Sequence, residues 1–148
     1  MKDSGFTLVE LVVTIGILSI VAAVAAPRFF QASTFDSRGF YDKSVAVVRL
    51  AQKTAIAWRR PVFVCVEVNR VIAGTAANCG TRLSYPVSGT AAVETAPAGV
   101  TLNPVEFSFD GLGSPSTGPV VITFTSTIAG DPARNITVAA NTGYVTAN

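Results

Sequence analysis

Residues 5–29, which read GFTLVELVVTIGILSIVAAVAAPRF, form an almost unbroken apolar run with one carboxylate, Glu10, near its start. As an α-helix rising about 1.5 Å per residue, the stretch from Phe6 to Ala26 reaches about 30 Å, the thickness of a bilayer core. A carboxylate inside hydrocarbon costs about 2.5–3.5 kcal/mol on insertion scales. Glu10 therefore needs either a place at the membrane surface or a positively charged partner.

The residues just before the run suggest what that partner is. A short charged leader, KDSG, precedes Phe6, and Glu10 is the fifth residue of a chain cut after Gly5. This arrangement resembles the prepilin-peptidase site of type IV pilins and type II secretion pseudopilins. The resemblance implies cleavage after Gly5, N-methylation of Phe6, pairing of Glu10 with the amino terminus of a neighbouring subunit, and a kink or local melting of the helix at Pro27.

Two other interpretations of the run remain open. A secretory signal peptide would have a basic start, a shorter apolar core and a small-residue cleavage site, and AVA at residues 23–25 offers the last of these. Three features argue against a signal peptide: the charge of Lys2 is offset by that of Asp3, the run contains an acid, and Pro27 follows closely after the supposed cleavage site. A permanent single-pass anchor is the second alternative, because the positive-inside rule gives only weak guidance here.

Composition narrows the class of protein. The 148 residues leave about 120 for one small domain after the leader and the apolar run. The formal net charge of +2 is too small to indicate a nucleic acid or an anionic surface as partner. The chain has no histidine, and two cysteines alone do not make a zinc site. It also has no G-x-S-x-G motif. We expect no enzyme, no metal site and no cofactor.

The rest of the chain predicts one helix followed by strands. Residues 28–60 read as an amphipathic helix that Pro61 ends, with apolar positions on one side at Phe40, Val47, Ala51, Ala55 and Trp58. Strands are expected within 61–68, 69–81, 105–113, 118–127 and 133–147, and residues 92–102 predict a loop that leads into a short strand. The Asp110-Gly111 pair is typical of a hairpin turn, and residues 141–143 predict a second hairpin. The fold class is α+β, a long N-terminal helix packed on an antiparallel β-sheet head.

A narrower resemblance covers nearly the whole chain. A helix ending in AWRRPVFVCV, a second cysteine further on, FSFDGLG and ITVAANTGYV are similar to the GspH/FimT family of minor pilins and pseudopilins. The resemblance implies a disulfide between Cys65 and Cys79, with two buried thiols as the alternative, and a position at or near a filament tip. Members linked to DNA uptake carry an arginine-rich element after the late glycine, but this chain reads GYVTAN there. DNA binding is therefore not supported by the C-terminal sequence.

The sequence thus predicts three segments. Residues 1–5 are a prepilin leader, 6–27 a transmembrane and filament-core helix, and 28–148 an amphipathic helix with a β-rich globular head. The expected partners are other pilin or pseudopilin subunits, the prepilin peptidase and methyltransferase, and the bacterial inner membrane before assembly. The head is expected in the periplasm or outside the cell. The alternatives are a DNA-binding minor pilin and a major, filament-forming pilin.

Three further features have both a functional and a structural interpretation. Trp58 could anchor a partner, but its place on the apolar stripe predicts the core. Asp110 could bind calcium, but one carboxylate is too few, which favours a role in turn geometry. The six basic residues could form one patch, although solvated surface is the expected role; they are Arg49, Lys53, Arg59, Arg60, Arg70 and Arg82.

Overall fold

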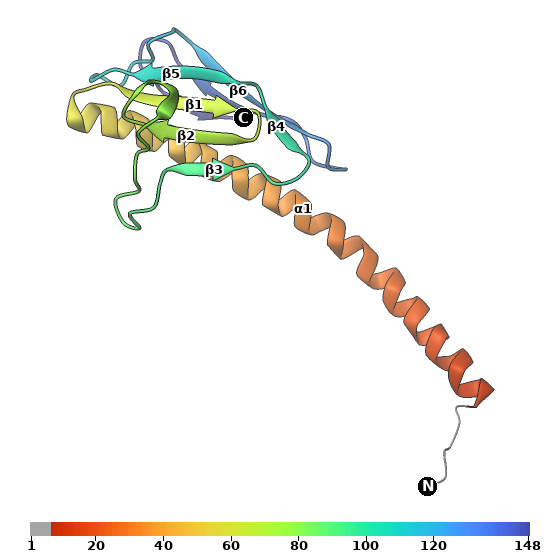
Figure 1. Cartoon of the computed structure of the whole chain (residues 1–148). Helices are drawn as coiled ribbons and strands as arrows, with labels where there is room; N and C mark the ends of the chain where they lie inside the picture. Colours follow the sequence, from red (N-terminus) through yellow and green to blue (C-terminus); the bar gives the residue numbers. More distant parts are fainter. Residues whose placement is uncertain (1–6) are drawn as a thin grey trace. The chain divides into compact units, whose positions relative to one another are not determined.

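The computed structural model describes the backbone of residues 7–148 and the side chains of residues 7–23 and 33–148 (Figure 1). Gly5 and Phe6, the predicted cleavage and methylation residues, lie outside the described residues. The chain divides into two units, Met1–Ser33 and Thr34–Asn148. The second unit contains all the strands found in residues 7–148, and we refer to it as the head.

Helix α1 runs from Leu8 to Trp58. It begins with a Thr-x-x-Glu pattern, and the Glu10 amide donates a hydrogen bond to Thr7 Oγ1 at 3.3 Å, as in an N-terminal capping box. The helix ends as the sequence predicts, just before Pro61. Arg59 takes a left-handed φ of 51°, and the Arg60 amide donates to the Ala55 carbonyl at 3.3 Å. This geometry satisfies one of the last helical carbonyls and turns the chain into the first strand.

The strands of the head form two antiparallel sheets of four. The first has the order β3-β2-β1-β5, made of Val93–Thr95, Arg70–Gly74, Val62–Glu67 and Val105–Phe109. The second has the order β4-β6-β7-β8, made of Val100–Leu102, Val120–Ser126, Arg134–Val138 and Val145–Ala147. A short 3₁₀ helix, Ala77–Cys79, follows β2. The predicted α+β class, a helix on antiparallel strands, is confirmed.

The division into two sheets differs from the single sheet that the strand pattern suggested. The Asp110-Gly111 pair does not join two neighbouring strands of one sheet: β5 pairs with β1, whereas β6 pairs with β4 and β7. The turn reverses the chain only far enough for one bridge, between Phe109 and Pro115. The β7–β8 hairpin at residues 141–143 is confirmed. Turn chemistry marks a reversal, but which strands then pair depends on long-range packing.

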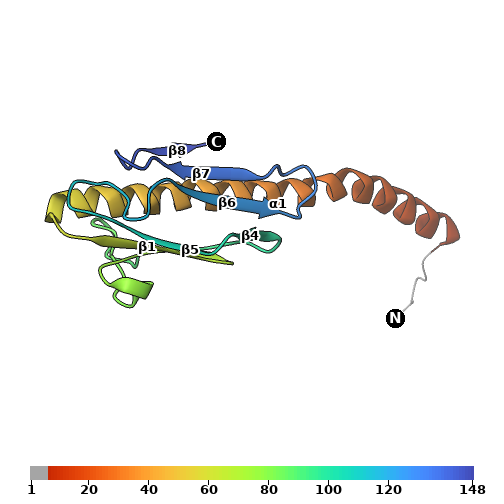
Figure 2. The same ribbon diagram turned by 90° about the horizontal axis from the view of Figure 1, so that it is seen from above.

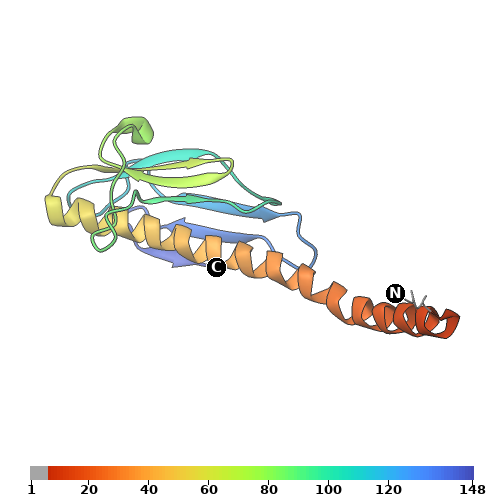
Figure 3. The same ribbon diagram turned by 60° about the horizontal axis from the view of Figure 1, so that its bottom comes forward.

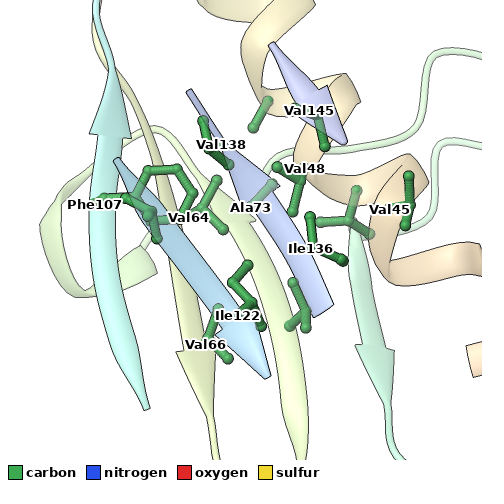
Figure 4. Close-up of a cluster of buried hydrophobic side chains, with 14 of the residues drawn as sticks. Val45, Val48, Val64, Val66, Ala73, Phe107, Ile122, Ile136, Val138 and Val145 are labelled. Atoms are coloured by element: carbon green, nitrogen blue, oxygen red, sulfur yellow. The ribbon is translucent and has the colours of Figure 1, made fainter. Parts of the chain in front are cut away.

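Both sheets share one hydrophobic core with the head part of α1. The core contains Val45 and Val48 of α1, Val64 of the first sheet and Ile136 of the second (Figure 4). Figure 2 shows β7 and β8 of the second sheet on one side of the helix and β1 and β5 of the first sheet on the other. Because two sheets contact it, α1 buries a wider stripe than one sheet would need. Phe40, Val47, Ala51 and Ala55 are buried as predicted.

Candidate functional site

The start of α1 combines an acid with an uncovered apolar surface. Every residue from 7 to 23 is exposed. The large apolar side chains of this segment are Leu8, Val9, Leu11, Val12, Val13, Ile15, Ile17, Leu18, Ile20 and Val21. Glu10 lies among them in the first helical turn, where a negative charge also suits the helix dipole. An exposed apolar surface of this kind is typical of a segment that contacts a membrane or another protein.

Two predictions about this segment stay open. The side chain of Pro27 lies outside the described side chains, and α1 continues as helix through that position. The predicted membrane span, residues 6–27, includes Phe6 and side chains that are likewise not described. Among the residues that the structure describes, no helix combines the length and the apolar composition that crossing a membrane requires.

The head contains a disulfide between Cys65 on β1 and Cys79 in the 3₁₀ helix. Both residues are buried, with their Cα atoms 6.1 Å apart, and they pack with Ile72 in a small second cluster beside the main core. The bridge therefore fixes the segment after β2 against the outer face of the first sheet. The backbone there is unusual, because Asn78 and Cys79 both have positive φ, 56° and 48°.

Asp110 shapes the loop after β5. Its Oδ1 accepts hydrogen bonds from the amides of Leu112 and Ser114, each at 2.9 Å, so the carboxylate holds the turn. Within the described residues, no group of three cysteine, histidine or acidic side chains gathers as a metal site.

Gln52 of α1 joins this loop to the β7–β8 turn. Its Nε2 donates to the Gly113 carbonyl at 3.1 Å and to the Thr142 carbonyl at 3.2 Å. At Gly143, which has a φ of +63°, a Cβ would collide with the Gly113 carbonyl oxygen. The two loops thus approach closely only because residue 143 is glycine. Sequence analysis missed this contact, since nothing local links residue 52 to residues 113 and 142.

A buried acid ties the start of the head helix to the β6–β7 connection. Asp131 accepts a hydrogen bond from Ser37 Oγ and pairs with Arg134 at 2.7 Å. Burial raises the pKa of Asp131, but hydrogen bonds from Ser37 and Ser126 together with Arg134 outweigh it and lower the pKa below the ordinary 3.8. This group is also absent from the sequence predictions, because Ser37 and Asp131 are far apart in the chain.

Trp58 is not a core residue, which makes the sequence prediction wrong. Its side chain is 47% exposed, and the Arg60 guanidinium lies 4.6 Å from the centroid of its ring. The apolar stripe that contains Phe40, Val47 and Ala51 continues to position 58, but it is covered only as far as Ala55, which is buried. Trp58 instead lines an open groove of about 690 Å³.

The six basic residues do not act alike. Lys53 and Arg82 line the same groove as Trp58. Arg49 donates to the Val145 carbonyl at 3.2 Å, and Arg70 forms an ion pair with Glu67 at 2.7 Å. The helix end and the β2–β3 connection therefore converge, as a patch would require, but only part of the set meets there.

Comparison with known proteins gives a motif match and a curated relative. The prokaryotic N-terminal methylation motif matches residues 1–26. The type IV narrow pilus major component PilA5 of Thermus thermophilus is 34% identical over 68 residues, which are 46% of this chain and 59% of that protein. The chain thus spans a little more than half the length of this curated relative.

Solved structures resemble the fold. The type IV minor pilin FimU of Pseudomonas aeruginosa superposes with a TM-score of 0.58 at 12% identity, covering 76% of this chain and 87% of FimU. The minor pseudopilin EpsH of the Vibrio cholerae type 2 secretion system superposes with a TM-score of 0.54 at 14% identity, covering 78% of this chain and 95% of EpsH. At such identities the likeness concerns the fold alone.

Proposed function

We propose that the chain is a type IV pilin-like protein and serves as a structural subunit of a type IV pilus or a type II secretion filament. The N-terminal methylation motif, the partial similarity to a pilus component and the fold shared with a minor pilin and a minor pseudopilin support this proposal. In this proposal, prepilin peptidase cuts the chain after Gly5 and Phe6 is N-methylated. The precursor spans the bacterial inner membrane once, with its head on the far side from the cytoplasm. The processed subunit lies at or near the filament tip and primes assembly.

The observation that carries the proposal is the uncovered apolar surface of residues 8–21 with one acid at its start. Lipid covers such a surface in the precursor, and neighbouring stems of other subunits cover it in a filament. The acid is costly in lipid but not beside a positive amino terminus. Glu10 thus favours the assembled state over the membrane state, which gives assembly a direction.

The apolar residues of the stem leave room for close helix packing. Gly16, Ala22 and Ala23 lie among the larger side chains, and small residues allow helix backbones to approach each other. Apart from the adjoining backbone of its own helix, no atom of the described residues lies within 4 Å of a Cβ added at Gly16, so the position is open to a neighbouring helix.

A second candidate is a shaft subunit present in many copies. The similarity to a narrow pilus major component favours it. The two candidates differ in stoichiometry. Quantitative mass spectrometry of sheared filaments would find a small fraction of the subunits for a tip protein and the dominant fraction for a shaft protein.

The experiment that tests the proposal is the intact mass of the protein isolated from its native membrane and from sheared filaments, without reduction. We expect a chain that begins with N-methylated Phe6 and lacks two hydrogens, owing to the Cys65–Cys79 disulfide. A chain that begins near Ala26 would identify a secreted domain and refute the proposal. An uncut chain absent from filaments would refute it as well.

A further inference from the structure

The groove beside Trp58 has a helical wall and a loop wall. The helical wall is one stripe of α1, with the i, i+3, i+4, i+7 and i+8 spacing of a single helix face, and contains Leu50, Lys53, Thr54, Ala57 and Trp58. The loop wall comes from the β2–β3 connection and includes Arg82, Leu83 and Pro86. Figure 3 shows this connection beside the C-terminal end of α1. The helical stripe therefore continues past the sheets as one side of an open groove.

The charged residues that line the groove are both basic. Lys53 and Arg82 lie in its walls, and Arg60 stacks on the ring of Trp58. None of its lining residues is acidic. Among the described residues, neither Lys53 nor Arg82 forms an ion pair with an acid of this chain. Two cations without an acidic partner border an apolar floor, so a matching ligand combines carboxylates with an apolar group.

The lining distinguishes between anionic ligands. A single-stranded nucleic acid binds by stacking its bases on open aromatic faces, but Arg60 already covers part of the Trp58 ring. The other apolar members of the lining are aliphatic: Leu50, Ala57, Leu83 and Pro86. Aliphatic side chains around an aromatic ring favour a bulky apolar side chain, which is a common anchor in protein interfaces.

We propose that this groove is a docking site for an adjacent filament subunit, which inserts a bulky apolar side chain flanked by carboxylates. The inference rests on the proposed function and adds the contact surface on the head and the chemistry of the partner segment. Trp58 and the aliphatic floor hold the apolar side chain. Lys53 and Arg82 pair with the carboxylates at the rim, where they select the partner and its orientation.

The first test reverses the charge of the groove in the full chain, expressed in its native cell. We expect Lys53→Glu/Arg82→Glu to lower the amount of protein in sheared filaments about tenfold, because like charges then face each other across the contact. The matched control is Arg38→Glu/Lys43→Glu, which changes the net charge equally at exposed positions of α1 outside the groove. The control should stay within about twofold of the unaltered protein.

Two measurements, the intact mass and the amount of protein in filaments, separate the two proposals. Leader cleavage and the Cys65–Cys79 disulfide, followed by intact mass, should be the same in both variants. If the unaltered protein is absent from filaments, the proposed function fails. If it is present and the groove variant assembles as well as the control, the docking inference alone fails. Equal loss in both variants also overturns the inference, because the effect then follows from net charge.

The second test identifies the occupant by photo-crosslinking from benzoylphenylalanine placed at Ala57 in the full chain. We expect a cross-link to a pilin-type subunit, within a peptide that has an acidic residue next to a bulky apolar one. A cross-link to DNA, to a peptide without acidic residues, or to nothing in filaments that contain the protein would overturn the inference. The same residue at Val121, which is exposed on β6 away from the groove, provides the control position.

Discussion

The negative charge of Asp131 contributes to the stability of the head. The pKa of this carboxyl is lower in the folded chain than the ordinary 3.8, so its contribution to stability is complete above that value and is lost as pH falls through the folded pKa. We expect Asp131→Asn to lower the free energy of unfolding at pH 7 by about 1–3 kcal/mol, because charge-assisted hydrogen bonds become neutral ones.

Urea unfolding of the purified full chain in detergent, measured from pH 7 down to pH 3, tests this expectation. The unaltered protein should lose stability below about pH 4, and the variant should lose less over the same range. If the variant loses as much stability between pH 7 and pH 3 as the unaltered protein, other carboxylates cause the loss of stability at low pH.

Gly143 is a second residue with a defined steric role. An alanine there meets the Gly113 carbonyl oxygen and must keep a positive φ. We expect Gly143→Ala to destabilise the head by about 2–5 kcal/mol, the sum of left-handed strain and overpacking. Gly130→Ala is the matched control: Gly130 also has a positive φ, +79°, but no atom lies within 4 Å of its added Cβ. It should cost only about 1–2 kcal/mol. Equal costs in urea unfolding would exclude the close approach as the cause.

At the scale of elements, the disulfide holds the 3₁₀ segment to the first sheet. The cysteines are 14 residues apart, and closing a loop of this size stabilises a chain by about 3 kcal/mol in the loop-entropy model. Reduction should therefore lower the free energy of unfolding by about that amount. Urea titrations with and without reductant measure it. The Cys65→Ser/Cys79→Ser variant should match the reduced protein and should not respond to reductant.

Local sequence patterns predict the end of the helix and the first strand correctly, but they do not predict the environment of Trp58 or the strand pairing at the Asp110 turn. The helix ends where Pro61 and the left-handed Arg59 require it, and the Val-rich strand β1 forms because alternate valines face the core. Trp58 departs from its pattern because periodicity reports which side of a helix is apolar, not how far the covering sheets extend. The Asp110 turn departs similarly, because the same turn fits a hairpin or a crossing between sheets.

At the scale of the whole molecule, Glu10 is expected to act only between subunits. Glu10→Gln keeps the capping-box pattern, since glutamine also suits that helical position, but removes the charge. We expect leader cleavage and head stability to stay unchanged and incorporation into filaments to fall at least about tenfold, as for the loss of one partner of a buried ion pair.

Immunoblotting of membranes measures leader cleavage, and immunoblotting of sheared filaments measures incorporation. Asp36→Asn, which removes an exposed acid further along α1, is the matched control and should assemble normally. Normal assembly of Glu10→Gln would mean that Glu10 serves the helix terminus of its own chain rather than a neighbour.

The sequence by itself determined the features that depend on residues close together in the chain. These are the apolar run with its acid, the processing motif, the helix end at Pro61, the positions of the strands other than β3, and the α+β class. They follow from periodicity, capping and backbone restrictions, each of which acts within a few residues. Residues 93–95 form β3, although the sequence predicted a loop there.

Only the tertiary structure decided what depends on distant segments. The split into two sheets, the contact of Gln52 with two loops, the pairing of Ser37 with Asp131 and the groove around Trp58 all join residues far apart in sequence. Their cause is the burial of one core between a helix and two sheets, which is a property of the packed chain as a whole.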